Sequence, residues 1–336
     1  MSANILIIGG TGFIGPHVTR AALAAGHQVT HFHRGRTAAP PDQQQVETIL
    51  GDRLVSEDLR RLAERQWDVV IDTSCYFPRA ARLTVEALGG RVGTYLFVST
   101  VSVYAPTATA YVSESAPLAE LADETTETVD GETYGGLKVL SEVEVMTGLP
   151  ERTLIVRPGL IAGPGDPTDR FTYWCRRLAG AGEVLAPGPP DHEVQYIDVR
   201  DLAQFMVDLA AAGARGVYNA TGPAAPVTME TLLDTCRSTG VGTATTVWID
   251  PEFLLTQGVA PWSELPLWVP ASVGSITASN RTAVSAGLHH RPLEQTVADT
   301  LAWACDRPAP GQDGPPGLAP ARERELLERW RSRESA

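Results

Sequence analysis

Short apolar runs alternate with amphipathic stretches along the first half of the chain. The run Ile5–Ile8 is aliphatic throughout, as expected for a strand buried on both faces. From Phe13 apolar residues recur at helical spacing as far as Gly26, a residue type that favours helix ends. Further strands are predicted at 27–33, 46–50, 68–74, 94–100 and 152–157, with helices at 56–66, 78–90 and 134–146. This alternation predicts an α/β fold with a doubly wound parallel sheet.

The second half of the chain is less regular. Glycine and proline are dense from Gly159 to Pro190 and from Pro251 to Pro270. Between these segments we expect a helix, a strand and a further helix, at 201–212, at 216–220 and from about Thr228. We expect a smaller, irregular lobe that holds the substrate at the carboxyl edge of the sheet, where α/β proteins bind ligands. The predicted division is 1–158 for the sheet domain, with 194–220 returning to it; 159–193 and 221–320 for the lobe; and 321–336 for a C-terminal helix.

Net charge and composition disfavour some kinds of binding partner and leave a small molecule as the expected one. The 336 residues carry a formal net charge of −13, which disfavours nucleic acid as a partner. No stretch approaches the roughly 20 apolar residues that span a bilayer, and the N-terminal apolar run is too short for a signal peptide. The four scattered cysteines resemble reduced thiols. We therefore expect a cytoplasmic protein with a small-molecule substrate and no membrane partner.

Three glycines, Gly9, Gly12 and Gly15, separate the first predicted strand from the first predicted helix. Glycine allows main-chain N–H groups to approach a bulky anion, and the N-terminus of a helix attracts negative charge. A dinucleotide pyrophosphate fits this pattern. A tight strand-to-helix turn without a ligand is the alternative.

Two further patterns bear on chemistry. Tyr134 and Lys138 are four residues apart on one predicted helix face, where an ammonium lowers the pKa of a phenol and makes it a usable acid or base. Ser99 and Thr100 end a predicted buried strand, where a hydroxyl can bind a substrate oxygen. The alternative for Tyr134 and Lys138 is a chance pair on an exposed helix. The alternative for Ser99 and Thr100 is that their hydroxyls only cap the end of the strand.

Together these motifs resemble the extended short-chain dehydrogenases/reductases, also called the NAD-dependent epimerase/dehydratase family. The resemblance covers nearly the whole chain and implies a Rossmann-like fold. Its motifs are GGTGFIG at 9–15, GD at 51–52, FVSTVSVY at 97–104, Tyr134-x-x-x-Lys138, RPG at 157–159 and QYIDVRDLA at 195–203.

The resemblance also assigns site residues. It makes Tyr134 the general acid/base, Lys138 the residue that holds the nicotinamide ribose, and Thr100 the substrate-binding hydroxyl, with Ser99 as the fallback. The residues expected at the dinucleotide are Gly9, Gly12 and Gly15 at the pyrophosphate, the Phe13–Ile14 backbone beside them, and Asp52 with Arg53 at the adenine. No metal site is expected, because His289 and His290 have no suitably spaced partner.

The end of the second predicted strand bears on the choice of cofactor. Members that bind NAD commonly carry an acidic residue there, whereas this chain has His33 followed by Arg34 and Arg36. A guanidinium pairs well with a 2′-phosphate. NADP(H) is therefore favoured over NAD(H), and an exposed basic turn is the alternative.

Two departures from the family pattern bear on the reaction. Val101 and Ser102 stand where dehydratases have an Asp-Glu pair, and Leu160 stands where nucleotide-sugar enzymes have an asparagine. These changes favour a reductase of a ketone or aldehyde that takes hydride from NADPH. A nucleotide-sugar epimerase that retains NAD is one alternative, and a non-catalytic, dinucleotide-sensing RNA-binding or regulatory protein is another. The resemblance further implies a homodimer formed through the helix at 134–146.

Overall fold

A computed structural model describes residues 2–106, 111–270, 272, 277–307 and 316–334. The chain forms two compact units, each assembled from three segments. Unit 1 comprises Met1–Gly159, Val199–Thr221 and Ile276–His289, and unit 2 comprises Leu160–Asp198, Gly222–Ser275 and His290–Ala336.

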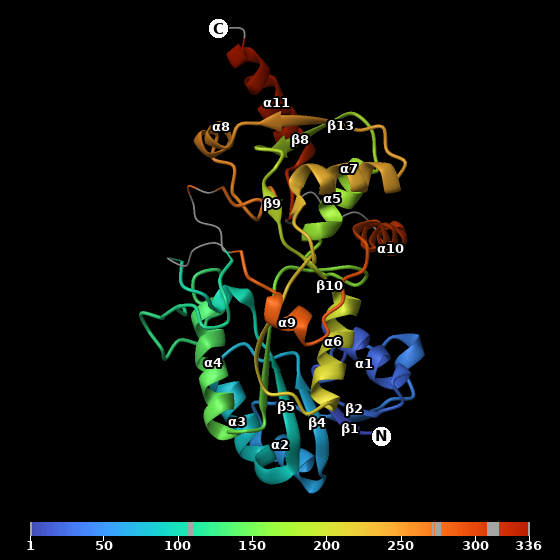
Figure 1. Cartoon of the computed structure of the whole chain (residues 1–336), viewed down its shortest axis with the longest axis vertical. Coiled ribbons are helices and arrows are strands. Elements are labelled where there is room, and N and C mark those ends of the chain that lie inside the picture. Colours follow the sequence, from blue (N-terminus) through green and yellow to red (C-terminus); the bar gives the residue numbers. More distant parts are fainter. Residues whose placement is uncertain (1, 107–110, 271, 273–276, 308–315, 335–336) are drawn as a thin grey trace. The chain divides into compact units, whose positions relative to one another are not determined.

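A parallel sheet forms the centre of unit 1 (Figure 1). Its order within the described residues is β11-β6-β5-β4-β1-β2-β3, and the chain direction across the sheet reverses beside β1. The strands are β1 (Asn4–Ile8), β2 (Gln28–His33), β3 (Glu47–Leu50), β4 (Trp67–Asp72), β5 (Val92–Val98), β6 (Thr153–Pro158) and β11 (Gly216–Ala220). This confirms the Rossmann-like, doubly wound α/β fold.

Helices cover both faces of this sheet, with α3 and α4 on one side and α6 on the other (Figure 1). The side chains of β1 point alternately to the two faces of the sheet. Leu6 and Ile8 belong to the core under α3 and α4. Ile5 and Ile7 point to the opposite face and are also fully buried. The helices of unit 1 are α1 (Ile14–Ala24), α2 (Ser56–Arg60), α3 (Pro78–Leu88), α4 (Tyr134–Gly148), α6 (Val199–Ala211) and α9 (Arg281–Ser285).

One predicted helix is shorter than expected. The α-helix predicted at 56–66 ends at Arg60 and continues as a 3₁₀ turn to Glu64. The turn is tied to the next strand by the indole N–H of Trp67, which donates to the carbonyl of Leu62 at 2.8 Å.

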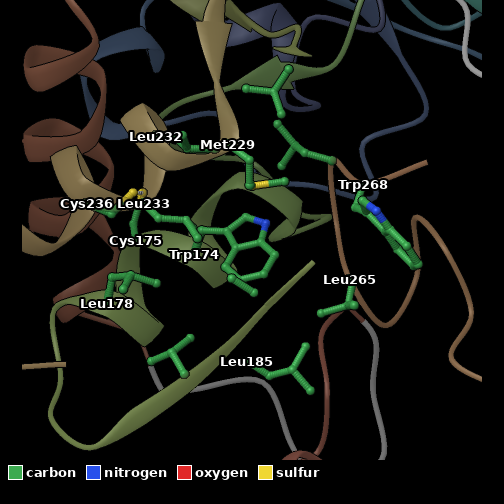
Figure 2. Packing of buried hydrophobic residues seen from close by; sticks show 14 of the residues in the cluster. Trp174, Cys175, Leu178, Leu185, Met229, Leu232, Leu233, Cys236, Leu265 and Trp268 are labelled. Atoms are coloured by element: carbon green, nitrogen blue, oxygen red, sulfur yellow. Dashed lines mark hydrogen bonds between the residues drawn. The ribbon is translucent and has the colours of Figure 1, made fainter. Parts of the chain in front are cut away.

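Unit 2 contains more regular structure than its glycine and proline content indicated. Its elements are β7 (Ile161–Ala162), α5 (Arg170–Leu178), β8 (Glu183–Pro187), β9 (Glu193–Val194), β10 (Ile197–Asp198), β12 (Val227–Thr228), α7 (Met229–Thr239), β13 (Thr245–Ile249), α8 (Pro251–Thr256), α10 (Leu293–Cys305) and α11 (Pro320–Glu334). Two tryptophans, Trp174 and Trp268, belong to its apolar core and are at most 1% exposed (Figure 2). Leu326 and Leu327 of α11 pack into the same core.

The division of the chain differs in two places from the one expected. The returning segment begins at Val199, and a third segment, 277–289, joins unit 1, although we expected it in the lobe. The side chain of Asn219 on β11 explains this, because its amide donates to the carbonyls of Val112 and Ser279. The tail after 320 belongs to unit 2. None of the described helices has the length and apolar character needed to cross a membrane.

Candidate active site

A pocket of about 350 Å³ opens at the carboxyl ends of β1, β2 and β4 in unit 1. This is the edge of a doubly wound sheet at which ligands bind, beside the reversal of strand order. Its lining includes Gly9, Gly12, Phe32, His33, Arg34, Arg36, Asp52, Arg53, Leu54, Ser74, Tyr76 and Phe77. Six of the residues expected at the dinucleotide line this pocket: Gly9, Gly12, Arg34, Arg36, Asp52 and Arg53. The other six are not among its lining residues: Phe13, Ile14, Gly15, Ser99, Tyr134 and Lys138.

The glycines of the first loop serve different purposes. Gly9 has φ +91°, and a Cβ there would lie 2.6 Å from Ser74. A Cβ at Gly15 would lie 2.5 Å from the backbone of Gly10, so Gly15 permits close packing of α1 on the loop. A Cβ at Gly12, in contrast, would meet only one backbone oxygen, at 3.8 Å. Packing within the chain does not require a glycine at position 12, whereas a ligand lying against this backbone does.

Tyr134 and Thr100 are in contact at the end of β5. Tyr134 begins α4, and its phenol lies close enough to the hydroxyl of Thr100, two positions after the strand, for that hydroxyl to act on the pKa of the phenol. The Thr100 hydroxyl also accepts from the N–H of Ser102 at 3.1 Å, which fixes its orientation. The two predicted catalytic hydroxyls therefore lie together.

The Lys138 ammonium is buried one helical turn further on. Its Nζ donates to the carbonyls of Cys75, at 2.7 Å, and Val98, at 2.6 Å, and lies 4.2 Å from the centre of the Phe97 ring. An ammonium has three N–H groups, so one is left for a ligand hydroxyl. Burial lowers the pKa of Lys138 to about 8.

The pKa of Tyr134 differs in direction from the sequence prediction. Burial raises the pKa of this phenol, the hydrogen bond from Thr100 opposes the rise, and a charge on Tyr76 would add to it. The spacing predicted a pKa lowered by Lys138. The sequence argument relied on a bound nicotinamide as well as on Lys138. In the protein alone the burial of the phenol dominates, and the ammonium donates to the carbonyls of Cys75 and Val98.

Arg53 is tied into a buried network beneath the pocket. Its guanidinium donates twice to Asp72, at 2.7 Å each, and once to Thr84, and Tyr95 donates to the same carboxylate. Burial alone would raise the pKa of Asp72, but the charge and hydrogen bonds of Arg53 lower it. Within the described residues, Nε of Arg53 is buried without a partner. Arg53 therefore forms a structural ion pair with Asp72, and its Nε–H is the donor without a partner among the described residues.

The remaining expected cofactor residues have clear positions. Asp52 lines the pocket, and its Oδ1 accepts from the N–H of Leu54 at 3.0 Å. Arg34 and Arg36 are exposed on the rim, where neither forms an ion pair with any described residue. Ser99 is 3% exposed at the end of β5, and its hydroxyl has no partner among the described residues.

These features fit a nicotinamide dinucleotide. The backbone at Gly12 is open to an anionic group. The Ser99 hydroxyl has no partner among the described residues, and the third N–H of Lys138 can donate to a ligand hydroxyl. The described residues contain no cluster of histidine, cysteine or acidic side chains arranged to hold a metal ion.

Sequence reasoning missed the contribution of the loop after β4. Ser74, Tyr76 and Phe77 line the pocket, and Cys75 supplies a carbonyl to Lys138. The available signal was their place immediately after a buried strand, at the edge of the sheet where ligands bind.

Comparison with known proteins identifies the family. The model of the NAD dependent epimerase/dehydratase family matches residues 5–221. The chain belongs to this family. Membership confirms the resemblance and the class of NAD-dependent oxidoreductase-type enzyme that the sequence indicated.

Individual relatives are distant. The chain is 30% identical over 192 residues to 2′-dehydrokanamycin reductase of Streptomyces kanamyceticus, an alignment that covers 54% of this chain and 51% of the reductase. It is 25% identical over 252 residues to the chloroplast stem-loop binding protein of 41 kDa b of Arabidopsis thaliana, covering 70% and 63% respectively. The chain thus matches about half of the reductase and less than two thirds of the stem-loop binding protein.

Among solved structures, the Thermus thermophilus UDP-glucose 4-epimerase in complex with NAD has a similar fold. The TM-score is 0.64 at 16% identity, with 89% of this chain and 98% of the epimerase covered.

Proposed function

We propose that this protein is an NADP(H)-dependent reductase of a ketone or aldehyde on a small-molecule substrate. The observation that carries this proposal is the Tyr134 phenol, which lies beside the Thr100 hydroxyl at the end of β5 and one helical turn from the buried Lys138 ammonium. This combination suits a proton donor placed beside a substrate oxygen.

The chain's own groups would divide the work as follows. NADPH, when bound, supplies the hydride. Tyr134 donates a proton to the substrate oxygen, and Thr100 holds that oxygen by a hydrogen bond. The third N–H of Lys138 holds the nicotinamide ribose. Burial raises the pKa of Tyr134, so its phenol carries the proton that reduction of the substrate consumes.

The rim of the pocket supports NADP(H) over NAD(H). Arg34 and Arg36 stand at the end of β2 without an ion-pair partner among the described residues, and His33 replaces the acidic residue typical of NAD enzymes. Two free guanidinium groups attract a 2′-phosphate, and no carboxylate at this position repels it.

The test is NADPH oxidation with a panel of carbonyl compounds, including keto-aminoglycosides because of the similarity to 2′-dehydrokanamycin reductase. Tyr134→Phe should reduce kcat by about 10² or more. Tyr218→Phe is the control, because its hydroxyl bonds only to the carbonyl of Arg215 in the same unit. No turnover with any carbonyl, or unchanged kcat in Tyr134→Phe, would overturn the proposal.

An epimerase that retains NAD is the competing enzyme. The structural similarity to an epimerase concerns the fold alone. Tightly bound NAD in the purified protein, together with epimerisation and no net oxidation of added NADPH, would favour it.

The similarity to a stem-loop binding protein favours a second, non-catalytic candidate. RNA affinity that falls steeply with salt, combined with no turnover, would support it. The net charge of −13 and the Tyr134–Thr100 contact weigh against it.

We also propose a cytoplasmic homodimer formed through α4. Val143 and Met146 are 47% and 41% exposed, one turn apart on this helix. Their burial between two copies would explain this exposure.

A further inference from the structure

Tyr76 is the most exposed of the phenylalanine and tyrosine side chains that line the pocket. It stands in the loop between β4 and α3 and is 49% exposed, whereas Phe32 at the same pocket is 1% exposed. Its hydroxyl has no hydrogen-bond partner among the described residues. A large ring at a ligand pocket with no internal contact for its polar end is available to contact a ligand.

The backbone that carries this ring is fixed on both sides. Before it, the Thr73 hydroxyl donates to the carbonyl of Ile8 at 2.9 Å, and the Cys75 carbonyl accepts from Lys138 at 2.7 Å. After it, α3 begins with Pro78, and the Phe77 ring lies under the Arg79 guanidinium at 5.6 Å. The backbone on both sides of Tyr76 is therefore held in place while its ring is half exposed.

The position of Tyr76 links the pocket to the reacting hydroxyls. It lines the pocket together with Gly9 and Gly12, and it is close enough to Tyr134 for a charge on one phenol to act on the other. The neighbouring Cys75 carbonyl holds the Lys138 ammonium. Tyr76 therefore lies between the part of the lining at Asp52 and Gly12 and the neighbourhood of Tyr134 and Lys138, where the second half of a dinucleotide would lie.

We propose that Tyr76 binds the nicotinamide riboside half of the dinucleotide and so positions it beside Tyr134. This inference rests on the dinucleotide binding in the proposed function. The ring supplies apolar contact area and the hydroxyl supplies a hydrogen bond, whereas the adenylate half depends on Asp52 and the rim arginines. Tyr76 is thus a positioning residue for the cofactor, and it distinguishes the whole dinucleotide from its adenylate half.

The test compares the dissociation constants of two probes, NADPH and adenosine 2′,5′-bisphosphate, by titration calorimetry. Tyr76→Ala should weaken NADPH about tenfold and change the affinity for the bisphosphate less than about twofold. Arg34→Ala is the matched contrast, because it should weaken both probes. Tyr218→Phe is the control for a tyrosine in the same unit that is remote from the pocket lining.

Equal losses for both probes, or no loss for NADPH, would overturn the inference. If Tyr76→Ala does not fold, as judged by circular dichroism, Tyr76→Leu is judged by the same comparison. Failure of the wild-type protein to bind NADPH would overturn both this inference and the proposed function. Tight NADPH binding without turnover of any carbonyl would overturn only the proposed reductase activity. The losses of affinity for NADPH and for the bisphosphate in Tyr76→Ala would still decide the role of Tyr76.

Discussion

Replacing His31 by phenylalanine should remove much of the acid sensitivity of unit 1. His31 is fully buried on β2, and its Nε2 lies 2.8 Å from the hydroxyl of Thr19. That hydroxyl donates to the carbonyl of Gly15, so Nε2 carries the imidazole proton and Nδ1 is bare. Within the described residues Nδ1 is buried without a partner. Protonation of the ring would therefore place an uncompensated charge in the core, directly beneath the glycine loop.

The size of the effect follows from the pKa. Burial, with a smaller contribution from His33, lowers the pKa of His31 from 6.5 to about 4. Between these values the unfolded chain binds more protons than the folded protein, so the free energy of unfolding falls as the pH falls from 6.5 towards 4. A gap of about 2.5 pH units corresponds to roughly 3 kcal/mol. Stability from this residue is fully present above pH 6.5 and lost by pH 4.

Urea unfolding of the wild type and of His31→Phe, at about pH 7 and about pH 4.5, measures this directly. The wild type should lose about 2 kcal/mol more than the variant between the two conditions. The lost hydrogen bond to Thr19 is the same at both pH values and cancels in the comparison. His289→Gln, at an exposed histidine, should behave as the wild type. An equal loss in the wild type and in His31→Phe would refute the burial argument.

Three other outcomes follow from the described contacts. Glu142→Ala should lower the free energy of unfolding by about 3–5 kcal/mol in chemical denaturation, because it leaves the buried Arg157 guanidinium without its carboxylate. The two carboxylate oxygens of Glu142 now accept from Nε and Nη2 of Arg157 at 2.9 and 2.6 Å. A loss below about 1 kcal/mol would contradict this prediction. Arg34→Ala should raise the KM for NADPH about tenfold or more in steady-state kinetics and leave the KM for NADH unchanged, and equal changes would count against a 2′-phosphate contact. Val143→Glu combined with Met146→Glu should convert a dimer into a monomer in light scattering, whereas an unchanged mass would place the interface elsewhere.

The sheet of unit 1 was predictable because its signals are local. An aliphatic run such as Ile5–Ile8 is typical of a strand buried on both faces, and the structure buries these four side chains almost completely. Part of the pocket lining was predictable for the same reason, since the glycines Gly9 and Gly12 and the end of β2 mark the ligand edge of such a sheet, whereas the loop after β4 was missed.

The rest depends on pairings that are distant in sequence. Arg53 was expected at the cofactor, but Asp72, 19 positions later, holds its guanidinium. The helix α5 was missed although its buried residues Phe171, Trp174 and Leu178 have helical spacing, because the surrounding glycines and prolines indicated irregular structure. The direction of the Lys138 ammonium is set by the carbonyls of Cys75 and Val98, which are distant in sequence. The four-residue spacing from Tyr134 to Lys138 therefore could not predict it.

The division of both units into three segments has a consequence for synthesis of the chain. The sheet of unit 1 lacks β11, which pairs with β6, until the ribosome has passed residue 220, and it lacks the 277–289 segment until later still. By then two stretches of unit 2 have already been made. A gene fragment ending at Gly159 would leave β6 as an open edge and lose α6, so neither unit can be cloned as one uninterrupted piece.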